Sequence, residues 1–197
     1  MTDKQVEKVK RKIDQCKKAL AADKKFWGGE YHDGRGIRYY LPELYLKIKD
    51  YRGGLRYLNW FDKNFPDDSG FPEFLFESTF IFFKCDRLKA AEIKARRTFY
   101  SDILLFDTFL ERQILNNEMT ENSNLSVIKL NDKFKYSRHD IEFNDFAKWL
   151  EEVLSNSTFL KFAKEFIQIE RQLKNEPVGK IRTQLVNRSY EIKYGKI

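Results

Sequence analysis

The chain has 197 residues, of which 42% are hydrophobic and 16% aromatic, and its formal net charge is +7. This length and apolar content suffice for one packed core or a short array of helix pairs. Glycine (9) and proline (4) are sparse, which favours helices and argues against a turn-rich β-sandwich. The positive charge suggests acidic partners, although moderate charge also serves solubility.

Cysteine usage and the apolar runs indicate the compartment. Cys16 and Cys85 are the only cysteines, so we expect free thiols in a reducing compartment. The opening residues, MTDKQVEKVKRK, lack the apolar stretch of a signal peptide. The unbroken apolar runs, such as 80–83 and 103–106, fall far below the ~20 residues that cross a bilayer. We therefore expect a soluble, cytoplasmic protein with no membrane contact.

Residues 2–24 predict an amphipathic helix, which with the loop after it forms a segment at 1–33. Its apolar residues alternate spacings of three and four, which gives a narrow seam on a charged rod. Nine Lys and Arg residues face four Asp and Glu residues in the first 25 positions. Such a basic arm could contact nucleic acid or an anionic membrane. The interspersed acids and the lack of Trp or Phe on the seam favour a helix docked on the following pair instead.

A glycine-rich connection, FWGGEYHDGRG, follows at residues 26–36. Asp33 is a candidate N-cap for the next helix. The GRG tripeptide at a helix start could cradle a phosphate, with Arg35 and Arg38 converging on it. The pattern is only a fragment of the glycine-rich fingerprints, and no strand precedes it. Arg35 and Arg38 are therefore candidate anion-binding residues on a partial motif.

Residues 37–66 predict two helices joined by a short turn. Apolar residues recur at helical spacing on both sides of Lys49-Asp50. Helices joined by so short a turn fold back on each other as an antiparallel pair. Pro42 has no backbone N–H, so the first helix is expected to kink there or to begin nearby.

This pair resembles a tetratricopeptide (TPR) repeat. The residues at the positions that define the repeat are Leu41, Tyr45, Tyr51, Gly54, Leu58, Phe61 and Pro66. Gly54 stands where the two helices of a repeat touch most closely. Phe61 and Pro42 depart from the pattern, which has small residues at both points. The stretch DGRGIRYYLPELYLKIKDY also resembles the opening of repeat segments in uncharacterised bacterial proteins.

A second, more degenerate copy follows, with helices at 72–83 and 88–99, and Ser101-Asp102 is expected to cap a partial third. TPR-like pairs thus span 34–115. Residues 116–140 are rich in Asn, Ser and Asp and predict a loop with a candidate domain boundary.

Three amphipathic helices without a repeat signature are expected at 141–197, the second capped by Ser157 and the third starting at Pro177. The predicted fold is all-α: a TPR-like superhelix of two to three helix pairs with a C-terminal helical bundle.

The candidates for enzyme chemistry are weak. His32-Asp33 and His139-Asp140 have the dipeptide used by helical metal-dependent phosphohydrolases, but both lie in predicted loops and the remaining ligands cannot be assigned. The cysteines and histidines lack the close pairs of a zinc site. No serine has a nucleophile-elbow context. We expect no enzyme, no metal and no cofactor.

By resemblance, TPR arrays bind peptide segments of other proteins on the concave face made by the first helix of each pair. The peptide-binding residues mapped to that face are Tyr39, Glu43, Lys47, Phe76, Phe80 and Lys84. Two alternatives stay open. Basic clusters at 84–97 and 180–193 could contact RNA, and the chain could be a structural subunit whose groove is filled by its own C-terminal helices or by a second copy.

Overall fold

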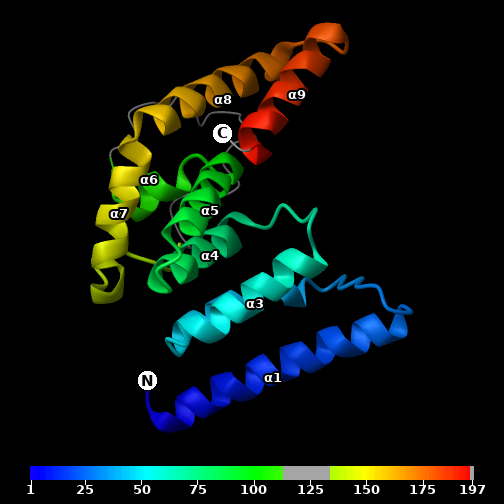
Figure 1. The fold of residues 1–197 in the computed structure, drawn as a ribbon, viewed down its shortest axis with the longest axis vertical. Helices are drawn as coiled ribbons and strands as arrows, with labels where there is room; N and C mark the ends of the chain where they lie inside the picture. Colours follow the sequence, from blue (N-terminus) through cyan, green and yellow to red (C-terminus); the bar gives the residue numbers. More distant parts are fainter. Residues whose placement is uncertain (113–133, 196–197) are drawn as a thin grey trace. The chain divides into compact units, whose positions relative to one another are not determined.

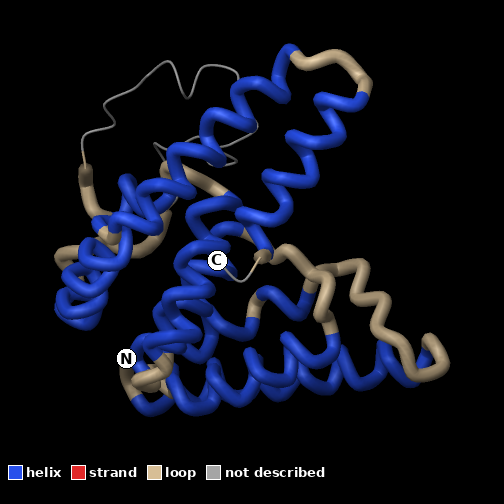
Figure 2. The backbone as a smooth tube through the Cα atoms, turned by 45° about the horizontal axis from the view of Figure 1, so that its top comes forward, coloured by secondary structure: helices blue, strands red, loops and turns tan. Residues whose placement is uncertain are grey.

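The structure is a computed structural model that describes residues 1–112 and 134–195. Every regular element in these ranges is a helix (Figures 1 and 2), so the predicted all-α class is confirmed. The chain divides into two compact units, Met1–Ala91 and Glu92–Ile197, and the division falls within helix α5 (Leu88–Ser101). The boundary expected at 116–140 therefore does not coincide with this division, and residues 116–133 lie outside the described ranges.

Unit 1 begins with helix α1 (Asp3–Phe26), which forms as the sequence predicts. Thr2 and Gln5 make a capping box, in which each side chain accepts the other residue's backbone N–H. The buried residues of the apolar seam are Ile13, Cys16 and Leu20. The helix packs against α2 (Leu41–Lys47), which confirms the expectation of a docked N-terminal helix.

The first helix pair consists of α2 and α3 (Tyr51–Asn64), preceded by the short 3-10 helix η1 (Ile37–Tyr39). Pro42 lies in the first turn of α2, where its missing N–H has no intrahelical partner to lose. The helix thus begins one residue before the proline, at Leu41, and a start near Pro42 is one of the two outcomes predicted. Asp50 caps α3 by accepting the Gly53 N–H at 2.8 Å.

Gly54 lies where three helices come closest. A Cβ added there would be 3.3 Å from the Cβ of Tyr45 on α2 and 2.9 Å from Cδ1 of Ile81 on α4 (Pro72–Lys84). The small residue expected at the contact of the first pair is therefore confirmed, and it also admits α4. Gly53 is similarly confined, because its Cβ would overlap the Asp50 carboxylate.

Helix α4 is buried on all sides over residues 74–82. A helix buried on every face lies inside a fold rather than at its surface, and the polar residues Glu77, Ser78 and Thr79 are buried with the apolar ones. It contacts both α2 and α3, so the four helices α1 to α4 build unit 1 around a core that α4 fills.

Unit 2 contains the rest of α5, then α6 (Leu105–Phe109), η3 (Ile141–Phe143), α7 (Asn144–Ser155), α8 (Ser157–Asn175) and α9 (Lys180–Tyr194). Helices α8 and α9 lie side by side as a hairpin (Figure 1). One buried cluster joins them to α5 and to the residues that follow α5. Its members are Tyr100, Ile103, Leu104, Phe166, Ile169 and Ile192.

Two helix starts in unit 2 differ from the sequence prediction. Asn156, not Ser157, caps α8 by accepting the N–H groups of Thr158 and Phe159. Helix α9 begins at Lys180 rather than Pro177, because the intervening residues form the hairpin turn. Arg182 stabilises this turn by donating to the backbone carbonyls of Leu173 and Glu176, at 2.6 and 2.8 Å. In the ranges that the structure describes, no helix combines the length and apolarity needed to cross a membrane.

Candidate binding site

The amide cradle predicted at the start of η1 is filled by the chain's own carboxylate. The Asp33 carboxylate accepts the N–H groups of Ile37 and Arg38 at 2.9 and 3.0 Å, so Asp33 acts as a cap there. The Arg38 guanidinium donates to the same carboxylate at 3.0 Å and to Asp68 at 2.8 Å. Arg38 is thus engaged by two acids of this chain and does not present itself to an external anion. Arg35 is exposed and lines a separate cleft beside α1.

Tyr39, predicted to contact a peptide, is part of this internal network. Its hydroxyl lies 2.7 Å from both carboxylate oxygens of Asp68. Burial, and then the hydrogen bond to Asp68, raise the pKa of Tyr39 to about 12. Burial alone would raise the pKa of Asp68, but donors from Tyr39, the Gly70 amide and Arg38 outweigh it and lower that pKa. The network ties the loop after α3 to η1.

The other predicted peptide contacts do not form an open groove. Glu43 and Lys47 make an ion pair of 2.8 Å along α2. Phe76 and Phe80 have no exposed surface, so their predicted role as exposed anchors does not fit this structure. Lys84 is exposed, and its ammonium lies 5.7 Å from the Phe80 ring centroid. The prediction of exposed anchors was wrong because Glu73, Glu77 and Lys84 lie three or four residues from these rings and mark this side of α4 as polar, although the fold buries it.

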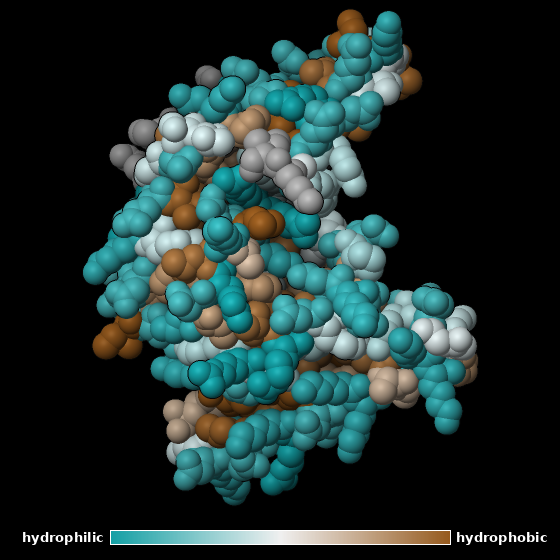
Figure 3. Space-filling view, viewed as in Figure 1, coloured by the Kyte–Doolittle hydropathy of each residue, from teal (hydrophilic) through white to brown (hydrophobic). Residues whose placement is uncertain are grey.

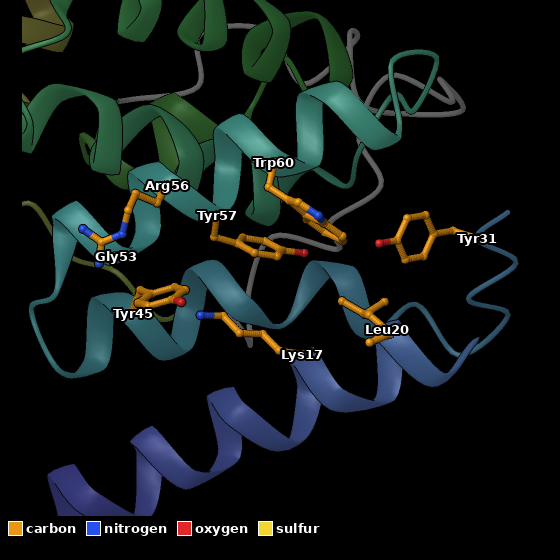
Figure 4. A pocket seen from close by; sticks show the side chains of 9 residues that line it. Lys17, Leu20, Tyr31, Tyr45, Gly53, Arg56, Tyr57 and Trp60 are labelled. Carbon is orange, nitrogen blue, oxygen red and sulfur yellow. The ribbon is translucent and has the colours of Figure 1, made fainter. Parts of the chain in front are cut away.

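A cleft that the sequence did not predict lies between α1 and α3 (Figure 4). Its volume is about 350 Å³, within the range of ligand pockets. The residues that line it are Lys17, Leu20, Ala21, Tyr31, Tyr45, Gly53, Arg56, Tyr57 and Trp60. Helix α1 supplies one wall and α3 the other, and the Tyr45 ring of α2 lies between them.

Aromatic rings form the floor of the cleft and hold one another in place. The Tyr57 hydroxyl donates to the Arg38 carbonyl at 2.6 Å, and burial raises the pKa of Tyr57, so the hydroxyl stays neutral. The Trp60 ring lies 5.4 Å, centroid to centroid, from Tyr57 on one side and from Tyr31 on the other. These contacts give the cleft a floor of mutually packed aromatic rings.

The charged residues that line the cleft are both cations. Lys17 on α1 has its ammonium 5.6 Å from the centroid of Tyr45, and Arg56 lies on the opposite wall at the same end (Figure 4). At the other end, the Lys24 ammonium lies 4.8 Å from the centroid of Tyr31. Positive charge therefore brackets the apolar floor.

Two carboxylates in neighbouring segments are already engaged. Asp23 accepts the backbone N–H groups of His32 and Asp33 at 2.8 and 3.0 Å, and Asp50 caps α3. In these contacts, neither Asp23 nor Asp50 forms an ion pair with a cation of the cleft. The arrangement suits a ligand with an apolar centre and negative charge on both sides.

The sequence carried a partial signal for this cleft. Gly53, Arg56, Tyr57 and Trp60 recur at offsets of three, four and seven, which places them on one face of α3. The face mixes a glycine, a cation and two large aromatics, and the exposed Arg56 shows that it is not wholly core. This face of α3 can be recognised as one wall of a cleft only when α1 is known to lie opposite it.

No family model matches the chain, and no curated protein or solved structure matches it. The helix–helix packing is compatible with a helical repeat, and the TPR resemblance itself stays a prediction. Over the described ranges, no group of three or more His, Cys, Asp or Glu residues could hold a metal ion. The two histidines belong to different units.

Proposed function

We propose that this protein is a helical scaffold that binds a short acidic peptide segment of a partner protein in the cleft between α1 and α3. The observation that carries the proposal is the apolar aromatic floor bracketed by cations at both ends. The occupant is a segment with one large apolar side chain flanked on each side by Asp or Glu.

The apolar side chain supplies most of the binding energy. Burying a Leu or Phe side chain contributes about 1.5–3 kcal/mol, and aromatic pockets are where interface energy concentrates. Each exposed ion pair adds only about 0.2–1 kcal/mol. We therefore expect modest affinity that depends on the anchor, with the charges setting orientation and association rate.

The basic surface of α1 supports an acidic partner. Hydrophilic side chains cover most of the visible surface of α1 (Figure 3), and lysine and arginine outnumber aspartate and glutamate along it. A surface of one sign attracts a segment of the opposite sign before contact is made. The same attraction weakens as salt is added.

Selection from a random peptide library displayed on phage tests the proposal. The full chain and a Lys17→Glu/Arg56→Glu variant are panned in parallel, with Lys63→Glu as a control for charge reversal outside the cleft. We expect the chain and the control to enrich peptides with an apolar residue flanked by acids, and the double variant to lose them. Enrichment without acidic residues, or the same peptides on the double variant, refutes the proposal.

A further inference from the structure

A second pocket lies within unit 2, where α5, α8 and the end of α9 meet. Its volume is about 490 Å³. Residues far apart in sequence line it, and they include members of both basic clusters that the sequence singled out: Arg96 and Arg97 from α5 and Lys193 from α9. The fold thus brings together two clusters that are about a hundred residues apart in the sequence.

The charged residues that line this pocket are all cations. Arg96 is held by Glu92 at 2.6 Å along the same helix. The Arg97 guanidinium lies 6.0 Å from the Tyr194 ring centroid, and the Lys193 ammonium lies 5.5 Å from the same centroid. Two cations therefore flank one aromatic ring at the pocket's edge.

Two acids of the adjoining hairpin are bound by another arginine. Arg188 donates to both carboxylate oxygens of Glu165, at 2.7 and 3.1 Å, and to Glu191 at 3.0 Å. These contacts lower the pKa of Glu165, chiefly through the hydrogen bonds from Arg188. Neither Arg97 nor Lys193 is a donor to these two acids, so both can act on an outside anion.

Tyr194 also contacts the exposed aromatic residue Tyr190. Its ring centroid lies 4.7 Å from that of Tyr190, and Tyr190 is 65% exposed. Two neighbouring rings, one of them with two cations beside it, form the kind of platform on which unpaired bases stack while phosphates contact Lys and Arg. A duplex does not expose its base faces in this way.

We infer that this pocket and the Tyr190–Tyr194 surface bind single-stranded nucleic acid. Phosphates contact Arg97 and Lys193, and bases stack on Tyr194 and Tyr190. The pairing of the exposed Tyr190 ring and the half-buried Tyr194 ring with adjacent cations distinguishes this site from the cleft of unit 1, whose Tyr45 and Tyr57 rings are almost wholly buried.

Fluorescence anisotropy of the full chain with a fluorescein-labelled oligouridine tests the inference. Tyr194→Ala is expected to weaken binding about fivefold to a hundredfold through lost stacking, whereas Tyr194→Phe keeps the ring and the affinity. Arg97→Gln is expected to reduce the slope of log K against log salt by about 0.7, the value for one phosphate contact on a single strand. Lys148→Gln, an exposed cation of α7 outside the pocket, serves as the matched control.

Four results overturn the inference. The first is that the oligouridine does not bind, and the second is that Tyr194→Ala and Tyr194→Phe lose equal affinity. The third is an equal change of salt slope for Arg97→Gln and Lys148→Gln, and the fourth is displacement of the oligouridine by polyglutamate at matched charge. The last result indicates an unspecific polyanion or acidic-peptide surface.

Discussion

Replacing Asp33 with alanine is expected to destabilise unit 1 by about 3–5 kcal/mol. The Asp33 side chain is 1% exposed, and its carboxylate accepts two backbone N–H groups and one guanidinium N–H. Removing one partner of a buried ion pair costs about 3–5 kcal/mol when the other charge is left without compensation. Arg38 keeps its bond to Asp68 at 2.8 Å, so the charge accounts for only part of the loss, and the two backbone N–H groups left without their acceptor account for the rest.

Asparagine at this position should cost less, about 1–2 kcal/mol. Asp33 has φ of +37°, a region that Asn tolerates and that costs alanine about 1–2 kcal/mol. The amide oxygen of asparagine also still accepts a backbone N–H. Asp33→Asn therefore loses mainly the charge.

Urea denaturation followed by tryptophan fluorescence measures these losses. Trp27→Phe and Trp149→Phe leave Trp60 as the single reporter, which lies in unit 1, and Asp67→Ala in an exposed loop is the control. A loss below about 1 kcal/mol for Asp33→Ala, or equal losses for the two Asp33 variants, refutes the reasoning that the carboxylate organises η1.

The remaining predictions concern packing and pH. Gly53→Ala should lower the unfolding free energy by about 1–2 kcal/mol, because its Cβ displaces the Asp50 cap. Gly54→Ala leaves that cap in place but crowds Ile81 and the Cβ of Tyr45, so overpacking should cost about 1–3 kcal/mol. Urea titration measures both losses, and an unchanged unfolding free energy for Gly54→Ala contradicts the close approach of the three helices. Phe80→Ala should cost about 3–5 kcal/mol because the ring is fully buried, and a near-neutral melting temperature contradicts that burial. The lowered pKa of Asp68 stabilises the fold above the ordinary carboxyl pKa of about 3.9, and this stability is lost as pH falls through the lower folded value. Asp68→Asn should flatten that acid-side loss in melts between about pH 2 and 5, and an unchanged pH profile contradicts the assignment.

Local signals in the sequence accounted for most of the helices. The apolar periodicity, Pro42 and Gly54 located α1 to α3, because spacing, proline geometry and close contact act within a few residues. The Asp33 cap was found for the same reason. Pro177 led to a wrong prediction of the first residue of α9, since proline also suits the turn that precedes a helix.

The sequence alone did not predict the long-range contacts. Arg38 and Asp68 are 30 residues apart, and nothing in either segment marks the other as its partner. The burial of Phe76 and Phe80 was missed because Glu73, Glu77 and Lys84 lie at helical spacing from these rings and mark that side of α4 as polar, whereas the tertiary packing buries it. The α1–α3 cleft required knowing which helices are neighbours, which periodicity does not supply.

The central claim is that the α1–α3 cleft holds an acidic peptide with an apolar anchor. NMR of the ¹⁵N-labelled full chain tests it most directly, during titration with a synthetic peptide in which leucine is flanked on both sides by glutamates. The indole N–H signal of Trp60, in the cleft floor, is predicted to shift with the added peptide, while that of Trp149 in unit 2 stays in place. A Trp60 signal that does not move at saturating peptide contradicts the account.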